Sequence, residues 1–268
     1  FAGYHSLFGR LSEETLALSD KIIEVSPFED GRVFLCNSGS EANDTMIKML
    51  WMYNLRKGNP NKRKIISRIN GYHGVTLGAS SLTAKPYNKV FGFPLKDFIS
   101  ADCPHYWKYA YENETEDDFS LRMANNLENL ILSEDPNTIA GFIAEPVQGA
   151  GGVIPPSKNY FDLIQPILKK YKIPFIADEV ICGFGRTGNL WGCETYNIKP
   201  DIIIASKCLT AGFFPMGAVL VKKDFADEFI EISEKEEEFP HGFTAGGHAV
   251  GCAIALKAID IIINEGLL

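Results

Sequence analysis

The chain has 268 residues, of which 46% are hydrophobic and 22% charged, as in a typical globular protein. Its formal net charge of −8 argues against nucleic acid or an anionic membrane surface as the main partner. No apolar run is long enough to cross a membrane. The six cysteines are scattered without a metal-type spacing, so we expect them to be reduced, in a cytoplasmic protein.

Short apolar runs alternate with longer helical patterns along the chain. We expect strands at 33–36, 64–69, 98–100, 139–144, 174–177, 201–205 and 217–222. We expect helices at 12–24, 40–56, 118–132, 160–171, 224–233 and 247–265, and a surface excursion at 102–118. Several strands show little alternation, which suits a sheet covered on both faces. The order predicts an α/β fold in one domain, with a seven-stranded, mostly parallel sheet flanked by helices. Ligands of such sheets bind at the carboxyl ends of the strands.

The first strand leads into the sequence CNSGSEAND, where Gly39 and Ser40 open a helix. Free backbone N–H groups and the helix dipole favour an anion there, typically a phosphate. The alternative is an ordinary N-cap formed by Ser40.

The second strand leads into the loop NGYHGVT, which carries Tyr72 and His73 between glycines. The Tyr72 ring could stack on a flat ligand, or could simply pack within the loop. For His73 the pattern favours a polar histidine at the surface.

The fourth and fifth strands end in carboxylates, Glu145 and Asp178. Asp178 follows apolar and small residues, so it needs a hydrogen-bonding or cationic partner, and Arg186 could supply an ion pair. Adjacent Glu179 should face the opposite side of the sheet.

The sixth strand ends at Lys207, which we expect to be desolvated beside these carboxylates. A desolvated lysine has a lowered pKa and can act as a nucleophile in Schiff-base chemistry. The alternative is an ion pair between Lys207 and Asp178 that serves only structure.

Six segments together are similar to the class III aminotransferases, in the order found in that family. They are NSGSEAND, GYHGVT, AEPVQGAGGVIPP, IADEVICGFGRTG, SKCLTAGFFPMGAV and HGFTAGGHAVGCA, and the resemblance covers almost the whole chain. It implies the large domain of a pyridoxal-phosphate (PLP) enzyme of fold type I, with the last strand antiparallel. The chain most resembles the ω-amino acid or amine:pyruvate branch.

The resemblance gives each candidate residue a role. Lys207 matches the lysine that binds PLP as a Schiff base, and Asp178 matches the aspartate that pairs with the pyridine nitrogen. Glu145 matches a supporting carboxylate beside the cofactor, and His73 lies in a motif that contacts it.

Further matches concern the ring and phosphate of the cofactor. Val180 and Tyr72 would pack on the two faces of the ring, and Gly39 and Ser40 match phosphate ligands. Thr244, in HGFT, matches a threonine that reaches the phosphate of the neighbouring subunit. This match implies a homodimer with shared active sites.

The sequence departs from the family pattern at several positions. Cys208 stands where glycine is expected, and Ala245 and Ala249 replace a larger residue and a proline. Ile181 replaces a glutamine of the ornithine and 4-aminobutyrate branches. Ala150 replaces a glutamate that partners a substrate-gating arginine in those branches, which favours pyruvate as the amino acceptor.

The resemblance therefore implies ping-pong transfer of an amino group from an amine or ω-amino acid to a keto acid. Relatives are longer at both ends, so we expect 1–268 to be the large domain without the N-terminal segment and the C-terminal small domain. Two alternatives stay open: a cofactor-binding fragment without turnover, and an aminomutase or decarboxylase on the same scaffold.

Overall fold

The computed structural model describes residues 11–236 and 239–268, whose strands form one sheet. The strands are β1 (Gly31–Cys36), β2 (Lys64–Arg68), β3 (Phe98–Ala101), β4 (Ile139–Ala144), β5 (Phe175–Asp178), β6 (Ile202–Ala205) and β7 (Gly217–Lys222). Their order is β1-β7-β6-β5-β4-β2-β3. β7 is antiparallel to both of its neighbours, whereas all other pairs are parallel. The predicted seven-stranded, mostly parallel sheet and its antiparallel last strand are confirmed.

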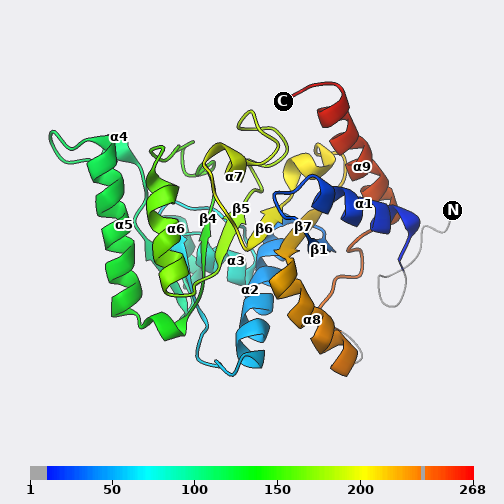
Figure 1. Ribbon diagram of the computed structural model, residues 1–268, viewed down its shortest axis with the longest axis horizontal. Coiled ribbons are helices and arrows are strands. Elements are labelled where there is room, and N and C mark those ends of the chain that lie inside the picture. The colour runs from blue at the N-terminus through cyan, green and yellow to red at the C-terminus, as the bar shows by residue number, and fades with distance from the viewer. Residues whose placement is uncertain (1–10, 237–238) are drawn as a thin grey trace.

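The helices lie on both faces of the sheet, so the molecule has three layers (Figure 1). They are α1 (Glu13–Glu24), α2 (Gly39–Arg56), α3 (Leu77–Leu82), α4 (Tyr106–Tyr109), α5 (Glu116–Ser133), α6 (Tyr160–Lys170), α7 (Gly192–Thr195), α8 (Lys223–Glu236) and α9 (Ala249–Asn264). Short 3-10 turns occur at Pro86–Phe91, Pro136–Thr138 and Lys207–Thr210. The short helices α3, α4 and α7 were not predicted. The expected excursion at 102–118 instead contains α4 and the start of α5.

Successive side chains of the central strands enter two different cores. In β6, Ile202 and Ile204 belong to the core under α2 and α8, whereas Ile203 belongs to the core under α1, α5, α6 and α9. All three side chains are fully buried. A strand covered on both faces has no place for polar side chains except at its ends. The polar residues that follow β2, β4, β5 and β6 are therefore brought to one edge of the sheet.

Helix α2 begins directly after β1, at the same edge. Its N-cap is Ser38, whose side chain accepts a hydrogen bond from the Glu41 backbone at 3.2 Å. Glu41 in turn accepts from the Asn37 backbone at 2.7 Å, so the first turn is fixed from both sides. The alternative in which Ser40 is the N-cap was wrong, and Ser40 lies inside the first turn.

Candidate active site

A pocket of about 240 Å³ opens at the carboxyl edge of the parallel strands. It is lined by Ser38, Gly39, Ser40, Tyr72, His73, Gly74, Glu145, Asp178, Val180, Ile181, Ser206 and Lys207. The structure thus brings together every site residue predicted from the sequence except Thr244. Among the described residues, no group of His, Cys, Asp and Glu could hold a metal ion.

The buried Asp178 carboxylate is at the centre of a hydrogen-bond network. Its Oδ2 lies 2.7 Å from His73 Nδ1 and 3.3 Å from Asn43 Nδ2, and its Oδ1 accepts from the Val180 backbone at 3.0 Å. A carboxylate only accepts, so with Asp178 ionised the Nδ1 atom of His73 carries the hydrogen. The network compensates for the burial of Asp178, which is 2% exposed.

Two interpretations of single residues were wrong. His73 is not a surface histidine, because it is 4% exposed and contacts Asp178. Arg186 does not pair with Asp178; its Nε instead donates to the Cys208 sulfur at 3.2 Å. The side chain that does contact Asp178, His73, is distant along the chain, so the local sequence could not reveal this contact.

Glu145 joins two loops that line the pocket. Its Oε1 accepts from the Tyr72 backbone at 3.1 Å and its Oε2 from the Gly149 backbone at 2.9 Å. Burial raises the pKa of the Glu145 carboxyl, although His73 opposes this rise. The buried Arg68 guanidinium donates to the Glu145 carbonyl and so supports the same turn. Glu145 thereby fixes the position of the Tyr72 backbone at the wall of the pocket.

The first turn of α2 forms the floor of the pocket at Gly39 and Ser40. A Cβ atom at Gly39 would lie 3.0 Å from a methyl group of Val180, and one at Gly74 would lie 2.4 Å from Ser40 Oγ. Gly74 also has φ of +133°, which side chains rarely adopt. The two glycines keep open the space in front of the N-terminus of an 18-residue helix. Such a helix end attracts an anion.

Lys207 follows β6 at the rim of the pocket. Its side chain is exposed, so the expectation that it is desolvated was wrong for this chain. Within the described residues Lys207 forms no ion pair with Asp178, which excludes the structural alternative. Lys207 has φ of +40°, a costly left-handed conformation for a residue with a side chain. The Lys207 side chain also lines the pocket.

Glu179 faces away from the pocket, as the strand alternation predicted. Its carboxylate accepts from the backbones of Gly192 and Cys193, at 2.9 and 2.6 Å. Burial raises its pKa to about 7. Glu179 therefore fixes the start of α7 next to the end of β5.

Thr244 lies outside the pocket and is exposed. Its loop is attached to α2 through His241, which lies 2.8 Å from both Thr45 Oγ1 and Lys48 Nζ. The His241 ring also stacks on Phe34. These contacts hold the loop on the outer surface.

Two polar residues of the site, Asn43 and Arg68, were not recognised from the sequence. Asn43 was not singled out as a site residue, yet its Nδ2 donates to the His73 carbonyl at 2.8 Å as well as to Asp178. Arg68 was assigned to a strand, and its burial beneath Glu145 was not foreseen. The helical position of Asn43, three residues after Ser40, could have placed it near the pocket, but no local pattern identified Arg68.

The family profile of the class-III aminotransferases matches residues 3–268. The chain belongs to the class III aminotransferases. It is 50% identical to gamma aminobutyrate transaminase 3, chloroplastic, of Solanum lycopersicum, over 100% of this chain and 52% of that protein. The chain thus spans about half the length of this curated relative.

Solved structures show the same similarity. An ω-aminotransferase from Paracoccus denitrificans is 64% identical, with a TM-score of 0.96 over 98% of this chain and 59% of that one. A PMP-bound aminotransferase from Vibrio fluvialis is 62% identical, with a TM-score of 0.96 over 98% and 58%. The fold is therefore that of PLP-dependent transferases of fold type I.

PLP is the cofactor of the class III aminotransferase family, and the residues of the pocket fit it. An anion site at the start of α2 and a buried carboxylate at the end of β5 lie in the same pocket. Asp178 Oδ1 accepts one hydrogen bond, from Val180, and can accept another from a ligand. A larger pocket at the opposite edge of the sheet contains neither Asp178 nor Lys207, so size alone does not identify this site.

Proposed function

We propose that this protein transfers an amino group from an amine or ω-amino acid to a keto acid such as pyruvate, using PLP. One observation carries the proposal. Lys207 and the buried, hydrogen-bonded Asp178 follow adjacent strands into the pocket that begins at the first turn of α2. This is the combination of a mobile amine, a fixed carboxylate and an anion site that the family's chemistry requires.

Asp178 would face the pyridine nitrogen of the cofactor. PLP, when bound, supplies an electron sink for the electrons left on the substrate carbon after a proton is removed. His73, Asn43 and the Val180 backbone all donate to the Asp178 carboxylate and hold it in place. With the cofactor bound, the Asp178 carboxylate would hold a proton on the pyridine nitrogen, which would keep that sink effective.

Gly39 and Ser40 would bind the phosphate through the N-terminus of α2. Tyr72 and Val180 would enclose the ring from its two faces, since both line the pocket and both are fixed through backbone hydrogen bonds. Glu145 supports this arrangement by holding the loop of Tyr72. His73 acts through Asp178 and is a positioning residue.

Lys207 would carry the proton between the substrate carbon and the cofactor carbon. Its exposed side chain has the reach for this, because no ion pair within the described residues restrains Nζ. The same amine would hold the cofactor covalently between turnovers.

The choice of acceptor rests on two residues of the pocket and its adjoining loop. Ile181 lines the pocket, and Ala150 follows the Gly149 backbone that Glu145 holds. Neither can provide the polar groups that the glutamate-linked branches have at these positions. Pyruvate has a single carboxylate, so its binding needs no additional polar group for a second carboxylate.

A donor panel tests this proposal. PLP-loaded protein is mixed with each amine or ω-amino acid and pyruvate, and alanine is quantified. We expect alanine to appear with at least one donor. When 2-oxoglutarate replaces pyruvate, glutamate should form more slowly than alanine does with pyruvate. Carbon dioxide release or an intramolecular amino shift without alanine would instead indicate a decarboxylase or an aminomutase.

A second candidate function is cofactor binding without turnover. The chain covers only 58% and 59% of the solved relatives from V. fluvialis and P. denitrificans, which favours this alternative. Residues 1–268 would then be the PLP-binding large domain. The same panel on a longer protein that contains this chain separates the two. Activity only in the longer protein would support the second.

We also propose a homodimer in which Thr244 completes the phosphate site of the other copy. Its exposure outside its own pocket supports this arrangement.

For the cellular location we propose a reducing compartment, the cytoplasm, because all six cysteines are free. No described helix is both long and apolar enough to cross a membrane.

A further inference from the structure

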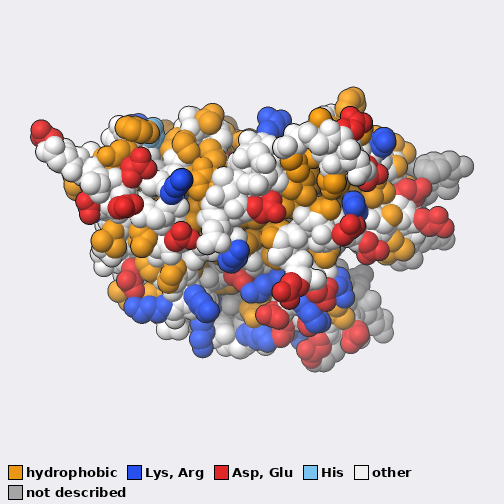
Figure 2. Space-filling view, turned by 45° about the horizontal axis from the view of Figure 1, so that its top comes forward, with side chains coloured by type: hydrophobic (Ala, Val, Ile, Leu, Met, Phe, Trp, Pro, Cys, Tyr) orange, Lys and Arg blue, Asp and Glu red, His pale blue; other side chains and the backbone are white. Residues whose placement is uncertain are grey.

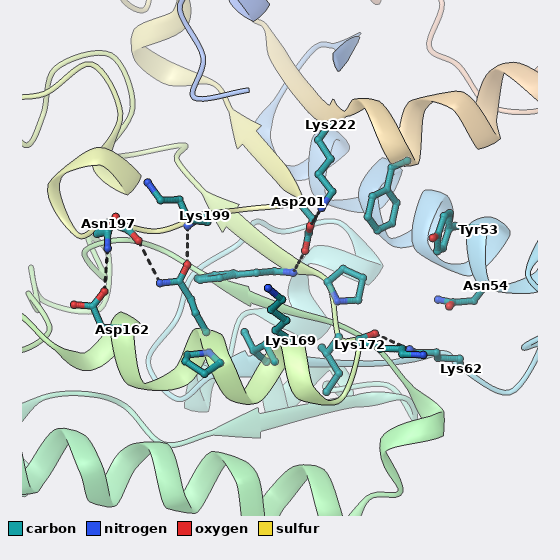
Figure 3. Close-up of a pocket in the computed structure, with 17 residues that line it drawn as sticks. Tyr53, Asn54, Lys62, Asp162, Lys169, Lys172, Asn197, Lys199, Asp201 and Lys222 are labelled. Carbon is teal, nitrogen blue, oxygen red and sulfur yellow. Dashed lines mark hydrogen bonds and ion pairs between the residues drawn. The ribbon is translucent and has the colours of Figure 1, made fainter. Parts of the chain in front are cut away.

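A second pocket, of about 800 Å³, lies at the amino edge of the parallel strands; we name it the amino-edge pocket. It includes Phe175, the first residue of β5. It also includes Asp201, which precedes β6 (Figure 3). Phe175 and Asp178 are the two ends of one strand, so the pocket lies roughly 10 Å from the candidate active site at about 3.3 Å per residue. No step of the proposed reaction uses it.

The amino-edge pocket has more basic than acidic side chains. Its lysines are Lys62, Lys169, Lys172, Lys199 and Lys222, and its carboxylates are Asp162 and Asp201. They come from separate parts of the chain, since α6, the loops on either side of β5, the segment before β2 and the end of β7 all contribute. Lys and Arg side chains lie along the lower edge of the face in Figure 2, with Asp and Glu side chains among them toward the right. In a protein with a net charge of −8, this is a local excess of positive charge.

The two carboxylates offset only part of that excess. Asp201 forms an ion pair with Lys222 and accepts from the Phe175 backbone at 2.8 Å. Asp162 accepts from the Asn197 side chain at 3.2 Å. Within the described residues, the other four lysines have no ion pair.

Two of these lysines repel each other. Lys62 is partly buried and donates to the Lys172 carbonyl at 2.9 Å (Figure 3). Burial lowers the pKa of Lys62, and the charge of Lys172 lowers it further. A bound anion would relieve this repulsion.

The helix dipole explains only part of the cluster. Lys169 and Lys170 lie in the last turn of α6, where cations are favoured. Lys170 pairs with Glu128 on the outer side, whereas Lys169 reaches into the middle of the pocket. Lys62 and Lys199 are outside any helix, so the dipole does not account for them.

The lining also includes the polar side chains of Asn54, Gln165 and Asn197, and an apolar surface with Ile173, Phe175 and Phe225 among its members. A free inorganic anion would leave this surface unused, and the volume exceeds that of a single phosphate group. We propose that the amino-edge pocket binds a small organic molecule that carries two or more phosphate or carboxylate groups. The lysines bind the charges and the apolar floor covers the body of the ligand.

Titration calorimetry of the PLP-loaded full chain tests this proposal, because loaded cofactor excludes anions from the phosphate site of α2. Fructose 1,6-bisphosphate and citrate are titrated separately at matched ionic strength, and they distinguish phosphate from carboxylate chemistry. We expect one equivalent of at least one probe to bind per chain. In the double variant Lys169→Glu, Lys199→Glu, affinity should fall at least about tenfold, since two nearby charges are reversed. Both lysines are exposed, so the fold should tolerate the change.

The control is the double variant Lys89→Glu, Lys96→Glu, which changes the net charge equally at two exposed lysines outside the pocket. Its affinity should stay within about twofold of the parent, because exposed charges beyond a Debye length are screened. Equal weakening in both double variants would show general electrostatic attraction and overturn the proposal. So would the absence of saturable binding of both probes.

Discussion

His73 Nδ1 and Asp178 Oδ2 lie 2.7 Å apart in the interior, although 105 residues separate them along the chain. The side chains are 1% and 2% exposed. The pair joins the loop after β2 to the end of β5, and the Asn43 amide of α2 contacts both members. Three separate elements thus fix the orientation of one carboxylate toward the pocket.

Asp178→Asn should retain PLP but lose transamination almost completely. The amide cannot stabilise a protonated pyridine nitrogen, and a hydrogen bond to a charged group contributes about 1.5–3 kcal/mol. By 1.36 kcal/mol per tenfold change, that range alone lowers the rate about 10- to 160-fold, and the weaker electron sink should lower it further. Cofactor absorbance and the single-turnover rate with an amine measure the two properties. Asp162→Asn, an exposed control at the other end of the sheet, should leave both unchanged. Near-normal turnover of Asp178→Asn would make Asp178 a structural residue.

Lys207 should carry the cofactor covalently. Borohydride treatment of the PLP-loaded protein, followed by peptide mapping, should place the pyridoxyl group on Lys207. The variant Lys207→Arg should take up no label. Lys222→Arg is the matched control, because Lys222 also lies at a strand end, but at the opposite edge. Labelling of another lysine in the parent protein would defeat the assignment.

The strands could be predicted within one or two residues because both faces of the sheet are buried. In β4 and β6 every residue is buried, which gave continuous apolar runs that end in charged or polar residues. The carboxyl edge then followed from the parallel topology, and with it the positions of Glu145, Asp178 and Lys207.

Side-chain partners could not be predicted in the same way. The contact of His73 with Asp178 depends on how the loop after β2 folds, and GYHG alone is compatible with a surface loop. The N-cap of α2 was misplaced by two residues because Ser38 and Ser40 are both good caps. The exposure of Lys207 depends on a left-handed backbone conformation that no pattern around it indicates.

Glu179 should make stability depend on pH. Its pKa is raised from 4.5 to about 7, so the folded state binds the proton more tightly than the unfolded state. The stability contributed by the protonated Glu179 carboxyl is therefore fully present below about pH 4.5 and is lost as the pH rises through about 7. At 1.36 kcal/mol per pKa unit, the loss is about 3 kcal/mol. The side chain in Glu179→Gln stays uncharged at every pH, like the protonated carboxyl, so the variant should not show this loss of stability.

Denaturant unfolding of the parent and Glu179→Gln between pH 4 and 8 checks this expectation. The difference in free energy of unfolding should grow with pH in favour of the variant. Glu112→Gln, at an exposed position, should show no such trend. A difference between the parent and Glu179→Gln that stays constant with pH would contradict the mechanism.

Thr244→Val should weaken cofactor retention and dimerisation together. Valine keeps the shape of threonine but lacks the hydroxyl donor that would reach the phosphate of the second copy. If PLP bridges two chains, binding that favours the dimer must by linkage make the dimer favour PLP. Apo protein should then dissociate at higher concentration than PLP-loaded protein, as sedimentation velocity would show. The variant should reduce that difference and release PLP faster on dilution.

Thr195→Val, another exposed threonine, should leave both properties as in the parent. A monomer at all concentrations, or a dimer with Thr244 turned toward its own α2, would refute the shared site. The chemistry assigned to Lys207 would be unaffected, because Lys207 and Asp178 come from the same chain.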